Sequence, residues 1–261
     1  MVITVPKLEM HVADACNLSC EGCNHYANYH LKGVLPLSEG RAWLEPWSER
    51  VAPVDFTFLG GEPLINPEVP EYLLLARRAW PHTRLRLVTN GLLLDRRTDL
   101  WRALERTRTT LTVSIHSDGA AYRARLDPQL ERAAVEASRR GVRLETRNCV
   151  DGWFRPYRGS GRAMKPFDDG DPAASWRACS ARHCVTLRDN ALWKCPPLAH
   201  LPRLAAKFEL WREPSWQLPL AYRPMTLDAD DDELRAFFAR GPEPACGMCP
   251  SRPEFFVKAV L

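Results

Sequence analysis

Residues 15–26 read ACNLSCEGCNHY, and this stretch holds the most informative pattern of the chain. Its cysteines, Cys16, Cys20 and Cys23, are spaced C-x3-C-x2-C directly after residues 7–12 (KLEMHV), which alternate like a strand. Three thiolates can hold three irons of a [4Fe-4S] cube and leave the fourth iron open to a ligand that is not protein. The alternative is a zinc site, for which His25 would supply a fourth ligand.

The composition is that of an ordinary globular protein. The chain has 261 residues, 45% of them hydrophobic and 26% charged, with a formal net charge of +4. The nine cysteines form no evenly spaced framework of a small secreted domain, and residues 1–6 are too short for a signal peptide, so we expect a cytoplasmic protein whose thiols bind metal. No apolar run is long enough for a membrane span, and the Arg-rich segments lack the interleaved aromatic residues of a nucleic-acid platform.

Short apolar runs alternate with helical patterns through the first 160 residues. The alternation predicts α/β architecture with a parallel sheet, arranged as a partial (β/α)6 barrel of the TIM type. The predicted strands are residues 7–12, 54–59, 85–88, 111–115 and 142–150, and the predicted helices are 38–50 (with Ser38 as N-cap), 69–80, 95–106 and 128–140.

The chemically unusual residues of this half all follow predicted strands. Because active sites of such barrels lie at the carboxyl ends of the strands, we expect these residues to share one rim. In strand order they are the cysteine loop, Gly60-Gly61-Glu62-Pro63, Asn90, His116 and Asn148-Cys149.

The last hundred residues have a different pattern. A Gly, Pro and Asp-rich stretch at residues 159–172 divides the chain into 1–160 and 161–261. Residues 184–195 (CVTLRDNALWKC) predict a β-hairpin turning at Asp189-Asn190, and residues 228–240 predict a helix.

A second motif, Gly60-Gly61-Glu62-Pro63, follows the cysteine triplet by about forty residues and makes the function of the triplet more specific. The two motifs together resemble those of the radical S-adenosylmethionine (SAM) enzymes, over roughly residues 7–160. The resemblance implies that Cys16, Cys20 and Cys23 bind a [4Fe-4S] cluster, that SAM chelates its open iron, and that Glu62 and its neighbours grip the ammonium group of SAM. Reductive cleavage of SAM would then give a 5′-deoxyadenosyl radical that abstracts hydrogen from the substrate.

The resemblance extends with less detail to other rim residues. Ser114 matches a serine that many members place near SAM, His116 stands where a related subgroup has Asp and contacts SAM or substrate, and Asn90 either contacts the cofactor or caps its turn. The usual aromatic residue before the third cysteine is replaced here by Gly22, so adenine packing must come from elsewhere, with Tyr26 as the candidate.

A second group of cysteines lies in the last third of the chain. It comprises Cys179, Cys184, Cys195, Cys246 and Cys249. Cysteines before, within and after a hairpin and a helix resemble the twitch domain, the one-cluster version of the SPASM domain. Four of the five would bind an auxiliary [4Fe-4S] cluster, with Cys179 and Cys184 competing for the last place, and four-cysteine zinc is the alternative.

This layout resembles the radical SAM dehydrogenase class that oxidises the aminocyclitol 2-deoxy-scyllo-inosamine. It favours an oxidoreductase that dehydrogenates a sugar or similar small molecule, with the auxiliary cluster as electron acceptor and a flavodoxin or ferredoxin as electron donor. The alternatives are an epimerase with Cys149 as hydrogen donor, a peptide-modifying enzyme, and an iron-sulfur redox carrier without enzymatic activity. Free cysteines such as Cys149 are more often small buried hydrophobic residues than hydrogen donors.

Overall fold

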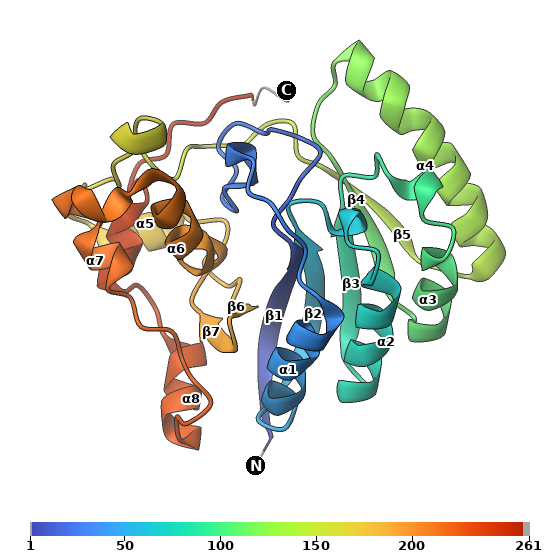
Figure 1. Cartoon of the computed structure of the whole chain (residues 1–261), viewed down its shortest axis with the longest axis horizontal. Coiled ribbons are helices and arrows are strands. Elements are labelled where there is room, and N and C mark those ends of the chain that lie inside the picture. Colours follow the sequence, from blue (N-terminus) through green and yellow to red (C-terminus); the bar gives the residue numbers. More distant parts are fainter. Residues whose placement is uncertain (1, 258–261) are drawn as a thin grey trace.

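Seven strands form one sheet in the computed structural model, which describes residues 2–257 (Figure 1). The strand order is β5-β4-β3-β2-β1-β6-β7, with every neighbouring pair parallel except β6 and β7. The bounds are β1 Ile3–Ala13, β2 Val51–Gly60, β3 Arg84–Thr89, β4 Thr110–Ile115, β5 Leu144–Asn148, β6 Thr186–Arg188 and β7 Ala191–Trp193. The predicted partial-barrel α/β fold is confirmed.

The helices fall into two groups along the chain. Helices α1 to α4 alternate with β1 to β5 and lie along the sheet, whereas the later helices gather beyond β6 and β7 (Figure 1). Their bounds are α1 Leu37–Ser48, α2 Val69–Ala79, α3 Leu100–Thr107, α4 Ala120–Arg140, α5 Pro172–Ala178, α6 Pro196–Phe208, α7 Gln217–Leu220 and α8 Asp231–Ala239.

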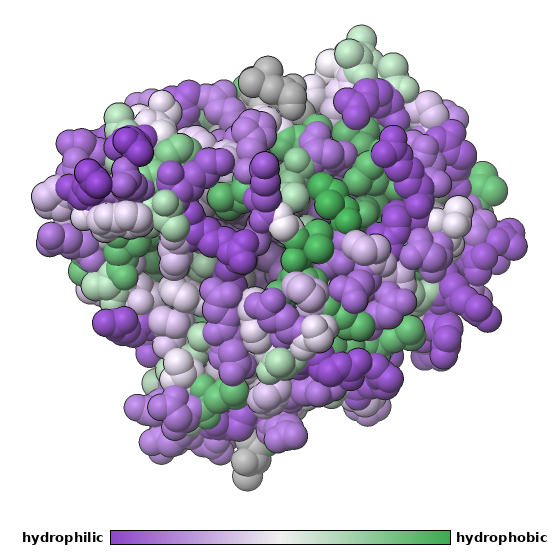
Figure 2. All heavy atoms as spheres, viewed as in Figure 1, coloured by the Kyte–Doolittle hydropathy of each residue, from purple (hydrophilic) through white to green (hydrophobic). Residues whose placement is uncertain are grey.

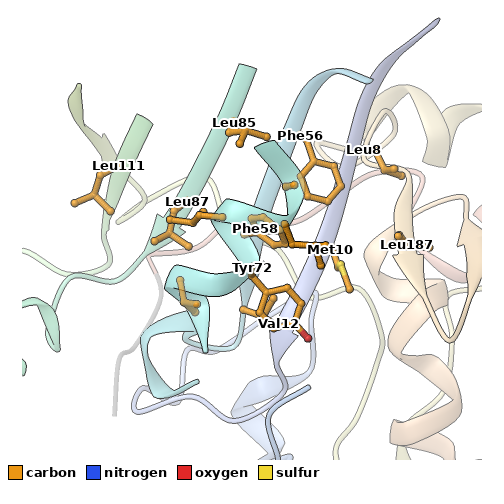
Figure 3. Close-up of a cluster of buried hydrophobic side chains, with 14 of the residues drawn as sticks. Leu8, Met10, Val12, Phe56, Phe58, Tyr72, Leu85, Leu87, Leu111 and Leu187 are labelled. Carbon is orange, nitrogen blue, oxygen red and sulfur yellow. The ribbon is translucent and has the colours of Figure 1, made fainter. Parts of the chain in front are cut away.

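One face of the sheet is apolar and packs against the helices. Alternate residues of each strand point to this face, which is the period of two expected of a strand (Figure 3). Tyr72 of α2 closes the cluster from the helix layer and donates from its hydroxyl to the Pro36 carbonyl at 2.8 Å. The strand residues of this cluster include Leu8, Met10, Phe56, Phe58, Leu85, Leu87 and Leu111.

The opposite face, which we call the inner face, is polar. It carries the intervening strand residues Lys7, Glu9, His11, Thr57, Arg86, Thr112, Ser114, Glu145, Thr186 and Arg188. They contact one another across strands: Arg86 donates to Thr112 at 2.7 Å and pairs with Glu145. Parallel sheets are usually apolar on both faces, so a polar inner face indicates a site for polar groups.

The bounds of three predicted helices differ from those in the structure. Helix α1 begins at Leu37 with Pro36 as N-cap, and Ser38 makes no capping bond. The predicted helix 95–106 is divided into a 3-10 turn, Leu94–Arg96, and α3, and between them the Arg97 side chain donates to carbonyls of the loop after β2. Helix α4 begins at Ala120 rather than 128 and carries Pro128 within it.

The C-terminal part shares the sheet but has its own core. The hairpin forms as predicted, with Asp189 and Asn190 both at positive φ (51° and 57°), and its first arm β6 pairs with β1. A second apolar cluster, centred on Trp216, Leu198 and Leu204, lies apart from the main core. The division at residues 160 and 161 stays a prediction, since the sheet itself continues across it.

The surface shows no extended apolar face in the view of Figure 2, where hydrophobic patches lie among hydrophilic residues. No helix within residues 2–257 has the length and apolar character needed to cross a membrane.

Candidate functional site

The cysteine triplet occupies a loop that leaves the carboxyl end of β1. Within it the Leu18 backbone N–H donates to Cys16 Sγ (3.4 Å) and the Cys23 N–H to the Cys20 carbonyl (3.3 Å). No disulfide joins any of the nine cysteines, all of which fall within the described residues. Burial, with Glu62, Cys23 and Cys20 nearby, raises the pKa of the Cys16 thiol to about 12. A cationic metal centre that binds the thiolates would offset both their burial and the repulsion among these negative groups. The donor set therefore fits an iron-sulfur cluster.

Gly60 and Gly61 dock the end of β2 against this loop. The Gly61 N–H donates to the Ala13 carbonyl at 2.8 Å and the Glu62 N–H to the Ala15 carbonyl at 2.9 Å. A Cβ atom at either glycine would lie 2.4 Å from a carbonyl oxygen of the loop. Only glycine allows this approach, and the approach fixes the position of the cysteine loop.

Glu62 is fully buried, and its carboxylate already has protein partners. Oε1 accepts from the Leu64 N–H (3.0 Å) and the Thr89 hydroxyl (2.6 Å), and Oε2 accepts from the Asn90 N–H (2.8 Å). Burial raises the pKa of Glu62 to about 7, against the lowering effect of these bonds. The side chain therefore joins the end of β2 to the end of β3, with Pro63 continuing into a 3-10 turn.

The other rim residues converge on the same loop. Asn90 caps its turn, since Oδ1 accepts from the Leu92 N–H, and Nδ2 donates to Asn17 in the cysteine loop at 2.7 Å; its contact with the cofactor stays a prediction. His116 Nδ1 lies 3.8 Å from Cys20 Sγ. Ser114 lies on the inner face of β4. Cys149 follows β5. Its backbone N–H donates to the Ile115 carbonyl, and its carbonyl accepts a hydrogen bond from the Trp153 indole.

Four of the five C-terminal cysteines meet around one cavity. They are Cys179, Cys195, Cys246 and Cys249. Burial, followed by the neighbouring thiols Cys179 and Cys246, raises the pKa of Cys249. Hydrogen bonds hold the last two cysteines in place. The Cys249 N–H donates to the Cys246 carbonyl, and the Ser175 hydroxyl of α5 donates to the Cys249 carbonyl.

Cys184 lies elsewhere, at the inner face beside β1. Its Sγ accepts from Lys7 Nζ at 3.2 Å, and burial, then Glu9, raises the pKa of the thiol to about 11. The sequence left Cys179 and Cys184 as rivals, and the structure brings only Cys179 to the other three.

Tyr26 is fully buried in the second core, where it packs near Tyr157. Burial and the thiols of Cys249, Cys195 and Cys23 raise its pKa well above the ordinary value. It thus lies between the two cysteine groups rather than on an open surface where adenine could stack. Gly22 is at positive φ (71°), and a Cβ there would meet Phe256 and the Phe154 carbonyl at 3.0 Å.

A polar group that the sequence did not single out lies under the rim. Glu9 and His11 of β1 meet His25, and Asp14 pairs with Arg188 of β6 (3.0 Å) and with Arg203 of α6. The signal was present in residues 7–12, whose alternation places a polar residue at every second position. The regular alternation did not indicate a buried polar group, because the polar side of an alternating strand often faces solvent.

Comparison with known proteins decides the family. The model of the radical SAM superfamily matches residues 10–151, which is more than half of the chain. The chain belongs to the radical SAM superfamily. The family implies a [4Fe-4S] cluster and SAM, and its enzymes act on a substrate with electrons from a reductant.

Individual relatives of this radical SAM protein are distant. It is 31% identical over 102 residues to GTP 3′,8-cyclase of Chlorobaculum tepidum, covering 37% of this chain and 29% of that protein. It is 34% identical over 114 residues to GTP 3′,8-cyclase 1 of Mycobacterium tuberculosis (strain H37Rv), covering 41% and 31%. The chain therefore matches less than a third of the length of these curated relatives.

Solved structures with a similar fold include two radical SAM proteins. Native anSMEcpe with bound AdoMet is 21% identical over 56% of this chain and 44% of that one, with a TM-score of 0.45. BtrN in an open conformation is 13% identical over 94% of this chain and 92% of that one, with a TM-score of 0.47.

Proposed function

We propose that this radical SAM enzyme is an oxidoreductase that dehydrogenates a small polar substrate. Cys16, Cys20 and Cys23 would hold the first cluster, and the rim residues of β2, β3 and β4 would surround SAM. When bound, the cluster and SAM supply a radical that takes a hydrogen atom from the substrate, and the substrate then gives up a further electron and a proton to form a carbonyl product.

The observation that carries this proposal is the four-thiol cavity. Cys179, Cys195, Cys246 and Cys249 line one space, and four thiolates are the complete ligand set of a [4Fe-4S] cluster. A second cluster has an immediate role in dehydrogenation, because it accepts the electron that the substrate must lose. Residues 161–261 would then be the twitch-type domain that holds it.

The substrate class follows from the inner face of the sheet. Arg86, Glu145 and Thr112 form a linked polar group there, and Glu9 and Lys7 form another. Charged side chains on both sides of a site suit a compound rich in hydroxyl or amino groups, such as a sugar or aminocyclitol. The reductant of the first cluster would be a flavodoxin or ferredoxin.

Epimerisation is the second candidate, and Cys149 favours it. The thiol is partly exposed at the carboxyl end of β5, beside Tyr122, whose hydroxyl accepts from the His116 N–H at the rim. A thiol there would donate a hydrogen atom to the opposite face of a substrate radical, returning the substrate to its original oxidation level.

The number of irons tests the second cluster. We expect about eight irons per reconstituted chain, falling by about half when Cys179 and Cys249 are both changed to Ala. Cys184→Ala is the matched control, and it should retain all the iron because this thiol faces Lys7. Four irons with one zinc in the wild-type protein would reject the auxiliary cluster, and loss of half the iron in Cys184→Ala would reject the ligand assignment.

Product analysis in D2O separates the two reactions. A dehydrogenase gives a product two mass units lighter than the substrate, and Cys149→Ala leaves that product in place, because loss of a small, partly exposed side chain costs at most about 1 kcal/mol of stability. An epimerase instead incorporates one solvent deuterium at an inverted carbon. Under that outcome Cys149→Ala would form 5′-deoxyadenosine without inverted product, and our choice would be wrong.

A further inference from the structure

The inner face of the sheet holds a compact group of nitrogen and oxygen donors, of which the proposed function uses only Glu9, as part of the polar lining that indicates the substrate class. Glu9 and His11 come from β1, and His25 comes from the loop two residues after Cys23. One donor atom of each lies within 4.8 Å of the donor atoms of the other two. We propose that Glu9, His11 and His25 form a binding site for a divalent transition-metal ion, separate from the cysteine triplet and from the four-thiol cavity, with the thiol of Cys184 beside Glu9.

His11 gives the strongest indication of a ligand. Its ring is buried, with 4% of the residue exposed, and neither ring nitrogen has a hydrogen-bond partner. Buried polar atoms without partners are rare because they lose their bonds to water and gain nothing in return. His11 Nε2 lies 3.8 Å from Glu9 Oε1, so a cation between the two would satisfy both atoms.

Neighbouring residues contact the side chains of Glu9 and His25. Hydrogen bonds of this kind orient the ligands in known metal sites. Thr186 of β6 donates to Glu9 Oε1 at 3.3 Å, and Lys7 lies 3.9 Å from the other carboxylate oxygen, Oε2. The His25 ring lies close to the backbone of Gly60, which would hydrogen-bond one ring nitrogen while the other binds a metal. Ligating histidines almost always use the other ring nitrogen in such a bond.

The charges around the group permit a cation. The nearest guanidinium, that of Arg188, is paired with Asp14 at 3.0 Å, and His200 packs against His11 with ring centroids 4.2 Å apart. Burial raises the pKa of Glu9, the carboxyl in the group itself, and a bound cation would favour its ionised form, which supplies one negative charge. A divalent ion would therefore meet one anionic and two neutral ligands.

The donor set selects the class of ion. Two imidazoles and one carboxylate suit Zn²⁺, Fe²⁺ and Mn²⁺, whereas Ca²⁺ and Mg²⁺ prefer oxygen ligands throughout. Metal-ligand distances of about 2.1 Å bring donor atoms to roughly 3.4 Å from one another, so the three side chains need to close by about 1 Å. Three protein ligands leave further coordination positions open.

Mn²⁺ is the probe that tests this site, because it favours nitrogen and oxygen ligands and binds thiolates poorly. The holoprotein, with its clusters reconstituted and excess iron removed, is titrated with Mn²⁺ while free Mn²⁺ is followed by its room-temperature EPR signal. We expect one saturable ion per chain. Glu9→Gln and His11→Gln should each weaken binding at least tenfold, and Mn²⁺ should raise the thermal unfolding midpoint of the wild-type protein but not of these two variants.

Glu145→Gln is the matched control, since Glu145 is an inner-face glutamate paired with Arg86 and has no histidine neighbour in the group. It should bind Mn²⁺ as the wild-type protein does. His25→Gln, on a loop, provides a third ligand variant if a β1 variant fails to hold its clusters. Absence of saturable binding below millimolar Mn²⁺, or equal binding by the Glu9 and Glu145 variants, would overturn the proposal.

Discussion

Single side chains fix the relation between the strand ends and the cysteine loop. Glu62 is the clearest case, since one buried carboxylate accepts hydrogen bonds from Leu64, Thr89 and Asn90 and so joins two strands at the rim. Such a carboxylate is costly to ionise, because burial favours the neutral form. The residue therefore couples the geometry of the rim to pH.

The pKa of Glu62, raised by burial to about 7, predicts a specific pH dependence. In the unfolded chain this carboxyl has an ordinary value near 4.5, so between pH 4.5 and 7 the folded protein holds the proton more firmly. Stability from this group is thus present at low pH and falls by about 3 kcal/mol as pH rises through that window. Glu62→Gln should remove this dependence, as measured by anaerobic urea unfolding at pH 5.5 and 7.5.

Glu62→Gln should also lose stability at the lower pH by about 1–3 kcal/mol, because its amide nitrogen would face a backbone donor. SAM affinity should fall at least tenfold while cluster content stays normal. Glu68→Gln, a partly buried glutamate that accepts from the Leu37 N–H, is the control. Parallel pH profiles for the wild-type protein and Glu62→Gln would show that Glu62 is not the titrating group.

At the scale of elements, the end of β2 and the cysteine loop are held by backbone contact. The two glycines after Leu59 pass within a distance that no side chain permits, so the loop between β1 and the 3-10 turn Ala27–Tyr29 takes its place from β2. The ligand geometry of the first cluster therefore depends on a neighbouring strand as well as on the cysteines.

Gly61→Ala tests that dependence. The new methyl group would lie 2.4 Å from the Ala15 carbonyl oxygen, so the loop carrying Cys16 must shift. We expect the reconstituted variant to lose most of the iron of the first cluster and its SAM cleavage, measured as iron content and 5′-deoxyadenosine. Gly241→Ala, where a Cβ would meet nothing within 4 Å, should keep both. Full iron content in Gly61→Ala would show that the loop holds its shape without this contact.

At the scale of the whole molecule, one sheet carries both cysteine groups. Strand β6 pairs with β1, which connects the C-terminal hairpin to the strand that precedes the cysteine triplet. Asp14 strengthens the connection by pairing with Arg188 of β6 and Arg203 of α6. The fully buried Tyr26 fills the space between the two thiol groups. The C-terminal part is thus positioned by the barrel and does not hang from a flexible linker.

The sequence by itself determined the local elements and the family. Strands, most helices and the hairpin turn followed from patterns of period 2 and 3.6 and from Asp189-Asn190, because these signals depend only on neighbouring residues. The cysteine triplet and the glycine motif were equally local, and the family model confirmed the membership that they indicated.

Tertiary structure alone decided which distant residues meet. Cys179 joins Cys195, Cys246 and Cys249 while Cys184 turns to Lys7, and a spacing of five residues cannot distinguish them. Likewise the alternation of residues 7–12 places Glu9 and His11 on one side of a strand, and only the structure shows that β6 and the cysteine loop enclose them with His25. The reason is physical: a strand pattern shows which residues share a face, but only the packing of segments far apart in the chain decides what that face contacts.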